Sequence, residues 1–256
     1  MDVFTKKARC GISFKDEILI DSHCHFGFHF TYVPYNTPDE IIKNMDRIGV
    51  QRACFCTLEV GMIGDHAIHN DRLAAFANAY PDRISAYFTP GLNYRERLLD
   101  DYIAYEKKGL NIGMKMHIYR QTFSITDDFL APVFERINAK RGIVINHDFG
   151  PPDRLETVLR DYPDISFISG HPNHNYIPLT KRYDNIYICT CASTAYQDVR
   201  NMAAKAGSEK IVVGSDFFVL DTAFGFGSVV FAEITEQEKR NILGLNMKRL
   251  LERVIQ

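Results

Sequence analysis

Short apolar runs alternate with segments of helical periodicity from residue 18 to the end of the chain. The runs are four to six residues long, which is typical of strands in a buried parallel sheet. The predicted strands are 18–21, 52–57, 84–88, 112–117, 143–147, 165–169, 186–189 and 211–214. Strands that alternate with helices pair in parallel through right-handed crossovers, so the pattern predicts an α/β fold.

Helix start and stop signals lie between these runs. Thr37-Pro38-Asp39-Glu40 is a capping box with proline at the first helical position, and 235–238 forms a second box ahead of the last apolar stripe. Residues 153–162 place apolar side chains on one helical face and end before Pro163. Eight such units close most economically into a (β/α)8 TIM barrel, with an open doubly wound sheet as the alternative.

Length and composition agree with this fold. Dividing 256 residues among eight units gives 32 residues each, close to the roughly 30 that a strand–crossover–strand unit needs. The 46% hydrophobic and 24% charged residues are those of an ordinary globular chain. Without a linker or low-complexity segment, we predict a single domain, 1–256.

Charge and targeting signals exclude several classes of function. A net charge of −2 offers no basic field for nucleic acid or a membrane surface, so a small-molecule substrate is expected. No apolar segment of ~7–15 residues follows Lys6, Lys7 and Arg9, and no run of ~18 apolar residues occurs anywhere. We therefore expect a cytoplasmic protein. A homodimer, in which a neighbouring subunit helps to select the substrate, stays open.

The six cysteines include two Cys-x-Cys pairs, Cys54/Cys56 and Cys189/Cys191. Four thiolates could hold a structural zinc ion. Both pairs, however, lie in or at the end of apolar runs, where a spacing of two puts both thiols on one face of a strand. We interpret them as small buried hydrophobic residues in a reducing compartment.

Histidines cluster where the predicted strands end. They are His23 and His25, His117, His147 and His171, and Asp216 follows the last strand in the same way. A barrel places its active site at the carboxyl ends of its strands, so these side chains should surround one site. His23 and His25 should point the same way with Cβ atoms roughly 7 Å apart, a span that one metal ion can bridge.

Several short motifs resemble the amidohydrolase superfamily, specifically its amidohydrolase-related branch, which includes decarboxylases similar to the aminocarboxymuconate-semialdehyde enzyme. The motifs are IDSHCHFG at 20–27, KMH at 115–117, INH at 145–147, SGHP at 169–172, VGSDFF at 213–218 and the closing segment 242–251. The resemblance covers about 18–251 and implies a (β/α)8 metal enzyme.

The resemblance also implies roles for the site residues. His23, His25, His147 and Asp216 would bind one divalent metal ion, for which we expect zinc. Asp216 would act as general base and then acid towards a metal-activated water, and His171 would stabilise developing negative charge. These roles predict a metal-dependent hydrolase that cleaves an amide, ester or lactone bond.

Other activities use the same residues. The first alternative is a lyase, a non-oxidative metal-dependent decarboxylase of a small carboxylic acid, with aromatic acids among the candidates. A deoxyribonuclease-like phosphoesterase is a second, although that branch has a glutamate ligand where this chain has Lys115 and His117. A barrel that binds ligands without catalysis is a third.

Four residues are predicted to contact the substrate: Lys115, His117, His174 and Phe26. Some superfamily members carbamylate a lysine on this strand and bridge two metals with it. For Lys115 and His117 we favour a substrate-anion contact, and the alternative is a structural lysine whose stem lies along apolar surface. His29 and the aromatic residues Phe28, Phe30, Tyr32 and Tyr35 belong to the loop after the first strand and could form a substrate wall or a partner surface. His66 and His69 are interpreted as a solvent-facing helix start.

Overall fold

A computed structural model describes residues 1–27, 37–58 and 64–255, and within them the eight predicted strands are present. The strands are β1 (Ile20–Phe26), β2 (Arg52–Thr57), β3 (Ile84–Ala86), β4 (Gly113–Met116), β5 (Ile143–Asn146), β6 (Ser166–Ser169), β7 (Ile186–Cys189) and β8 (Ile211–Val212). Most are shorter than predicted. The first is shifted, because β1 begins at Ile20 and runs through both histidines instead of ending before them.

Helices separate the strands in chain order. They are α1 (Val3–Arg9), α2 (Pro38–Ile48), α4 (His66–Ala79), α5 (Leu98–Lys107), α6 (Ile118–Gln121), α7 (Ala131–Ala139), α8 (Pro152–Asp161), α9 (Ile177–Thr180), α10 (Asp198–Ala206), α11 (Thr222–Val230), α12 (Glu236–Arg240) and α13 (Asn246–Arg253). Short 3-10 turns η1 (Leu92–Arg97), η2 (Asp128–Leu130), η3 (His174–Tyr176) and η4 (Ser208–Lys210) precede some of them, and the π-helical turn η5 (Asn241–Leu245) joins α12 to α13.

The predicted helix signals work as expected. The side chain of Thr37 accepts from the backbone N–H of Glu40 and the Glu40 carboxylate accepts from the backbone N–H of Thr37, which confirms the first capping box. The Thr235 box has the same two bonds to Glu238. Helix α8 begins with Pro152 and ends at Asp161, before Pro163.

All strand pairs are parallel and follow the order of the chain. β1, β2 and β3 form one sheet, and β4 to β8 form the other. A parallel bridge between Phe88 and Met114 links the first sheet to β4 at one edge. At the other edge, the segment after β8 bridges Cys24 of β1 through Phe217. The Ser22 N–H donates to the Val213 carbonyl (2.9 Å) on the same seam. The two sheets therefore meet along both edges, in the arrangement of a (β/α)8 fold.

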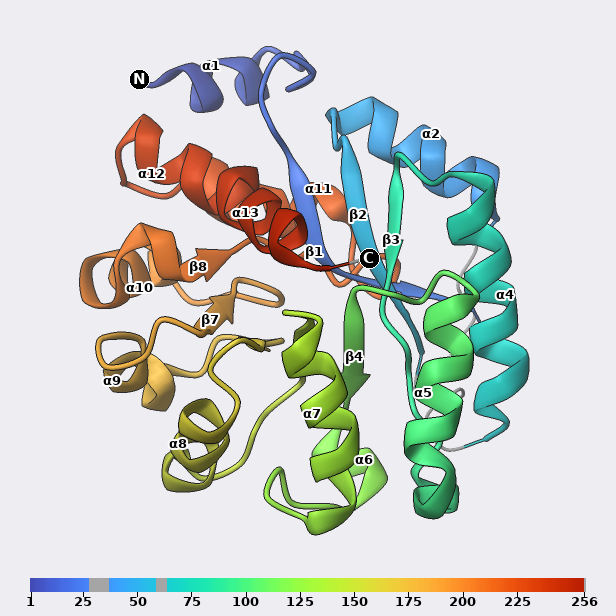
Figure 1. The fold of residues 1–256 in the computed structure, drawn as a ribbon. Coiled ribbons are helices and arrows are strands. Elements are labelled where there is room, and N and C mark those ends of the chain that lie inside the picture. Colours follow the sequence, from blue (N-terminus) through green and yellow to red (C-terminus); the bar gives the residue numbers. More distant parts are fainter. Residues whose placement is uncertain (28–36, 59–63, 256) are drawn as a thin grey trace.

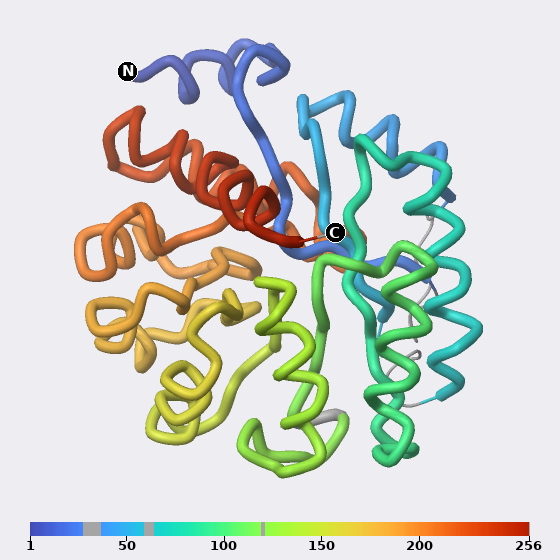
Figure 2. The backbone as a smooth tube through the Cα atoms, viewed as in Figure 1, coloured from blue at the N-terminus to red at the C-terminus, as the bar shows by residue number. Residues whose placement is uncertain are grey.

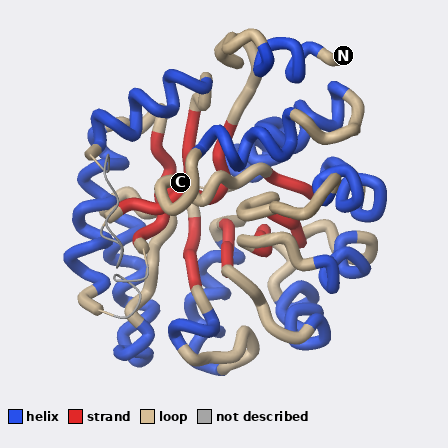
Figure 3. Tube along the Cα trace, turned by 180° about the vertical axis from the view of Figure 1, so that it is seen from behind, coloured by secondary structure: helices blue, strands red, loops and turns tan. Residues whose placement is uncertain are grey.

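The figures show the strands as a central ring with the helices outside it. Helices α2, α4, α5, α7, α8, α9 and α10 lie around the rim (Figure 1), and the view from behind shows the red strands surrounded by blue helices (Figure 3). The last helix crosses the middle of the ring (Figure 2). Asn246 of this helix donates to the carbonyl of Ile211, and the Ile255 N–H donates to the Lys140 carbonyl. These bonds place α13 at the amino ends of the strands, which leaves the carboxyl ends to the loops.

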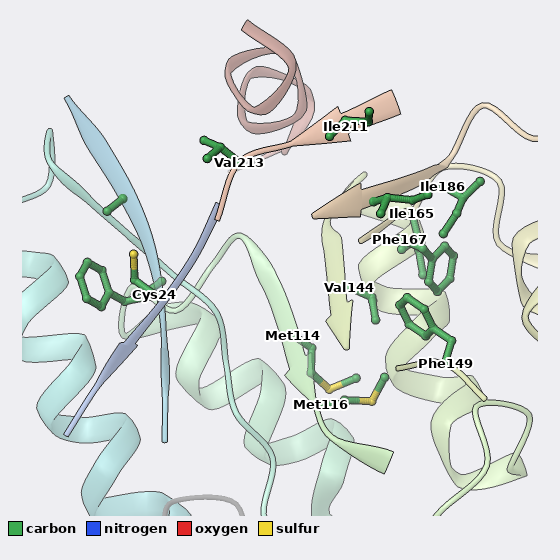
Figure 4. Close-up of a cluster of buried hydrophobic side chains, with 14 of the residues drawn as sticks. Cys24, Met114, Met116, Val144, Phe149, Ile165, Phe167, Ile186, Ile211 and Val213 are labelled. Atoms are coloured by element: carbon green, nitrogen blue, oxygen red, sulfur yellow. The ribbon is translucent and has the colours of Figure 1, made fainter. Parts of the chain in front are cut away.

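Alternation along the strands separates two buried clusters. The outer cluster lies between strands and helices and includes Cys24, Met114, Val144, Phe167 and Val213 (Figure 4). The inner cluster contains the side chains that point into the ring and those of α13 and the residue after it that cover them: Ile20, Cys54, Cys56, Tyr87, Ile112, Ile143, Ile145, Ile168, Cys189, Cys191, Val212, Met247, Leu250 and Val254. His25, which has the opposite parity to Cys24, consequently faces inwards.

No helix among the described residues has the length and apolar character needed to cross a bilayer.

Candidate metal centre

Seven polar side chains gather at the carboxyl ends of the strands. β1 contributes His23 and His25, β4 contributes Lys115 and is followed by His117, His147 follows β5, His171 follows β6, and Asp216 lies beyond β8. Because all strands run parallel, these ends belong to the same side of the ring. The chain positions span residues 23 to 216, so only the tertiary fold brings them together.

One part of the centre, here called the β1–β8 side, consists of His23, His25 and Asp216. The His25 Nε2 atom lies 2.8 Å from Asp216 Oδ1, and the His23 Nε2 atom lies 3.9 Å from the same oxygen. Asp216 has a φ of 60°, a left-handed conformation that is uncommon for a residue other than glycine. Its N–H donates to the His23 carbonyl (3.0 Å), and this bond holds the strained residue against β1.

The His23 ring is fixed from both of its nitrogens. Nδ1 lies 3.0 Å from the Gly170 carbonyl and can only donate to it, which leaves the lone pair on Nε2. Lys115 Nζ lies 2.8 Å from Nε2 and donates to that lone pair. A Cβ at position 170 would come within 3.2 Å of His23 Cε1 and 2.9 Å of the Asn146 carbonyl, so glycine makes room for the ring. Burial and Lys115 hold the pKa of His23 well below its ordinary value.

His25 is held in the opposite charge state. Burial disfavours its charged form, but Cys56 and the hydrogen bond to Asp216 outweigh burial and raise the pKa of the imidazole to about 10. The pKa of Asp216 shifts in the opposite direction. Burial raises it, but the contact with His25 outweighs burial and holds the pKa of the carboxyl far below its usual range. The two residues thus form a buried ion pair at neutral pH.

The facing part, here called the β4–β6 side, is a stack of imidazoles. The rings of His117 and His147 are stacked with centroids 4.3 Å apart, and His171 lies 4.0 Å from His147. Burial, followed by Lys115, lowers the pKa of His147 to about 4. Burial, followed by His147, lowers the pKa of His171 to about 3. Both rings are therefore neutral at pH 7 and keep one lone pair each.

A second carboxyl lies beneath the β1–β8 side. Asp21 is fully buried and accepts hydrogen bonds from the backbone N–H groups of His23 (3.2 Å) and Ser215 (3.0 Å). Burial raises the pKa of this carboxyl to about 6. The sequence pattern does not identify Asp21 as a site residue, because it is the last residue of the predicted strand 18–21.

The donors present fit a divalent metal ion. Within the described ranges, two groups of three side chains have ligand atoms all within 4.8 Å of one another: His23, His25 and Cys56, and His23, Cys191 and Asp216. Imidazole, carboxylate and thiolate donors are those that zinc accepts. His23 also has the outer hydrogen bond that orients a metal-bound histidine. His147 is in neither group, so its predicted role as a ligand stays a prediction.

Two predicted substrate residues have other partners. Phe26 stacks on Phe76 of α4 (centroids 4.9 Å apart), because it lies on the opposite face of β1 from His25. This position gives Phe26 a packing role, and its predicted substrate contact stays a prediction. His174, in η3, bonds Asp198 (2.8 Å), which also accepts from Ser193.

Other predictions have mixed outcomes. His29 and the aromatic residues Phe28, Phe30, Tyr32 and Tyr35 lie outside the described residues. His66 is buried with its Nε2 3.4 Å from Asp101, so the prediction of a solvent-facing helix start is wrong for this residue. All four thiols of the Cys-x-Cys pairs are buried, as predicted, but Cys56 and Cys191 also reach the centre. The Cys-x-Cys spacing of the two pairs was the sequence signal that could have identified Cys56 and Cys191 as residues of the centre.

A comparison with protein-family models finds one match. The amidohydrolase model covers residues 20–253, which includes every residue of the centre. No protein with a curated description matches the sequence.

Solved structures share the fold at low sequence identity. The 2,6-dihydroxybenzoate decarboxylase from Rhizobium is 14% identical with a TM-score of 0.75, over 92% of this chain and 99% of that one. The 5-carboxyvanillate decarboxylase from Sphingomonas paucimobilis is 14% identical with a TM-score of 0.70, over 92% and 99%. The dihydroxybenzoic acid decarboxylase from Polaromonas sp. JS666, which contains manganese, is 13% identical with a TM-score of 0.73, over 92% and 97%.

Proposed function

The chain belongs to the amidohydrolase family, and on that premise we propose that it is a metal-dependent decarboxylase of a small aromatic carboxylic acid. The net reaction releases CO2, and the ring carbon that loses the carboxyl group takes up one proton. Water is not consumed. The observation that carries the proposal is the buried side chain of Lys115, which contacts an imidazole of the centre.

Lys115 lies inside the centre. It is 1% exposed and its Nζ lies 2.8 Å from His23 Nε2. The Asp216 carboxylate is hydrogen-bonded to His25. A buried ammonium is costly unless it is paired, so a substrate carboxylate beside Lys115 would complete the charge balance. The proposed role of Lys115 is therefore to anchor the carboxylate that is to be lost.

The His25–Asp216 pair holds the proton that the reaction needs. A hydrogen shared over 2.8 Å between an imidazole and a carboxylate is ready for transfer to an acceptor placed beside the carboxylate. Breaking the bond between the ring carbon and the carboxyl carbon leaves an electron pair on the ring carbon. We assign the resting proton to His25, which passes it to the Asp216 carboxylate, and Asp216 delivers it to that carbon. A proton from solvent then restores His25.

The neutral histidines have binding roles. His171 can donate one hydrogen bond to an oxygen of the substrate. His23, His147 and Asp216 would hold a divalent metal ion, and His25 would join them only after giving up its proton. Such an ion supplies Lewis-acid stabilisation of negative charge on substrate oxygens. The neutral state of His23 and His147 suits them to this role, since only a neutral imidazole has a lone pair for a metal.

The similar structures support the choice of a lyase over the hydrolase that the motifs first suggested. Those compared above are named as decarboxylases of hydroxylated benzoates, and one contains manganese. Cleavage of an amide, ester or lactone needs the same ligands, so it remains the competing activity. The two differ in whether water or CO2 takes part.

The experiment measures both activities on one preparation. The metal-loaded protein is incubated with 2,6-dihydroxybenzoate, 5-carboxyvanillate and related hydroxybenzoates in D2O, and with a matching panel of esters and lactones. We expect CO2 release together with one deuteron on the product ring. Asp216→Asn should abolish both signals, whereas Asp161→Asn, an exposed carboxylate of α8, should change neither. Turnover of the esters or lactones without CO2 release would overturn the proposal in favour of the hydrolase.

A further inference from the structure

Cys191 points into the centre from a strand that supplies none of the predicted ligands. It lies two residues beyond β7, is fully buried and belongs to the inner cluster. Its Sγ, a ring nitrogen of His23 and a carboxylate oxygen of Asp216 all lie within 4.8 Å of one another. Donors on one zinc ion, bound at ~2.0–2.3 Å, are about 3–4 Å apart, so a small contraction suffices.

Gly214 makes this approach of β7 to β1 feasible. A Cβ at position 214 would lie 2.4 Å from Cys189 Sγ, 2.8 Å from His23 Cβ and 3.4 Å from Cys191 Cβ. The first two distances are too short for any side chain. The absence of a side chain therefore lets the thiols of the β7 end and the His23 ring share the space inside the seam.

The other nearby thiol, Cys56, has a different position relative to the ligand atoms. Its Sγ lies 3.4 Å from the Cys24 carbonyl, to which it donates, and 3.3 Å from His25 Nδ1. Nδ1 is the nitrogen opposite to the one that faces Asp216. Cys56 is thus placed to orient His25 from behind, the role that outer hydrogen-bond partners have at metal-bound histidines. Cys191 instead lies beside the ligand atoms themselves.

Charge balance gives the thiol a reason to bind. A divalent cation beside neutral His23 and His25 and the Asp216 carboxylate would carry a net charge of about +1, and the Lys115 ammonium, with Nζ 2.8 Å from His23 Nε2, would add to it. A second anionic donor would neutralise the charge of the metal and its ligands, leaving that of Lys115 for the substrate. Thiolates favour zinc and other thiophilic ions, whereas manganese prefers oxygen donors.

From these contacts we propose that Cys191 is a ligand of the metal ion, and that its thiolate makes this centre select zinc over manganese. The inference rests on the metal centre of the proposed function and adds to it a donor and a metal preference.

The test uses a spectroscopic signal that does not depend on activity. Chelator-treated protein is titrated with Co²⁺, whose visible bands report binding and whose near-ultraviolet thiolate charge-transfer band reports a sulfur ligand. The wild type should show both. Cys191→Ala and Cys191→Ser should lose the charge-transfer band, whereas Cys54→Ala, which removes another buried thiol of the inner cluster, should keep it. Circular dichroism of each variant checks that it folds. If Cys191→Ala does not fold, Cys191→Ser provides the test, because serine nearly preserves the side-chain volume of cysteine.

Competition between Zn²⁺ and Mn²⁺ gives the second measurement. Cys191→Ser should weaken zinc binding by more than the roughly 10–100-fold that loss of an outer partner costs, and should leave manganese binding nearly unchanged. Visible Co²⁺ bands without a charge-transfer band in the wild type would overturn the thiolate ligand while leaving the metal centre intact. Loss of the band in Cys56→Ala with retention in Cys191→Ser would likewise overturn it. Absence of any Co²⁺ binding by the wild type would overturn the metal centre and this inference together.

Discussion

On the β1–β8 side of the centre, His25 is a cation paired with the Asp216 carboxylate, whereas on the β4–β6 side His147 and His171 are neutral rings in a stack. His25 and Asp216 are buried and His147 and His171 are partly buried, and burial disfavours the charged imidazole on both sides, so burial alone does not explain the difference. An adjacent carboxylate outweighs burial on the first side, and the neighbours on the second side are Lys115 and other imidazoles, which add to the effect of burial.

This contrast suggests a division of labour. The charged pair can hold and transfer a proton, because the carboxylate and the imidazolium lie within hydrogen-bond distance. The neutral stack can offer lone pairs to a metal and N–H groups to a substrate. Four predictions test whether the two sides differ in this way, in order of decreasing effect.

Asp216→Asn should have the largest effect, because it removes both the proton donor and a metal ligand. We expect turnover of the aromatic acid to fall by about 10³-fold or more. Removal of the ion pair should also return the pKa of His25 towards its ordinary value. Steady-state kinetics and the NMR titration of His25 measure the two effects, with Asp161→Asn as the control. Turnover near that of the wild type would contradict the assignment.

Two variants separate the roles of the neutral histidines on the β4–β6 side. His147→Ala should lose bound metal and activity together, because we assign this ring to the metal. His171→Ala should retain metal while turnover falls by about 10²-fold, the size of effect expected when one hydrogen bond to developing charge is lost. Metal content by mass spectrometry and the turnover of each variant decide between the two roles. If both variants retain metal equally, His147 is not a ligand.

Asp21 should make the metal-free protein less stable as the pH rises. Its pKa is about 6 in the folded state and 3.8 in a model compound, so the folded state binds the proton more tightly. Its contribution to stability is complete below about pH 4, is lost as the pH rises to about 6, and amounts to roughly 2–3 kcal/mol. Asp21→Asn keeps an acceptor for the two backbone N–H groups and should remove this decline.

Urea unfolding of both proteins between pH 4 and pH 7.5, in the presence of chelator, measures the effect of Asp21. The difference in unfolding free energy between the wild type and Asp21→Asn should grow in favour of the variant as the pH rises. A difference that does not depend on pH would show that Asp21 ionises as freely in the folded chain as in the unfolded one.

Lys115→Met should have the smallest effect, confined to substrate binding. Loss of a charge-assisted hydrogen bond to the substrate carboxylate should raise KM by about 10-fold. Metal binding should not weaken, since the Lys115 ammonium competes for the Nε2 lone pair of His23. Lys239, a second buried lysine that donates to the Val230 carbonyl, provides the matched control. Lys239→Met should leave KM unchanged, and equal KM values for the two variants would contradict the anchor role.

The motifs at the strand ends predicted much of the centre, but not its contacts. The spacing of His23 and His25 indicated a shared face, and both do face inwards. The predicted end of β1 at Asp21 is wrong. The change from apolar to polar residues indicated a strand end, but β1 continues through the polar histidines to Phe26. Phe26 was assigned to the substrate, although strand alternation places it on the face opposite to His25.

The sequence by itself determined the order and type of the elements, the caps of α2 and α12, and the set of side chains at the strand ends. These depend on local periodicity and on neighbours a few residues away. Only the tertiary structure decided that Asp216 meets His25, that Gly170 and Gly214 make room for His23, and that Cys191 reaches the same atoms. Those contacts join β1 to the segments after β6, β7 and β8, so they arise across the inside of the ring and where its two ends meet. Charge states follow from the same contacts, because burial and neighbouring charges exist only once the chain has folded.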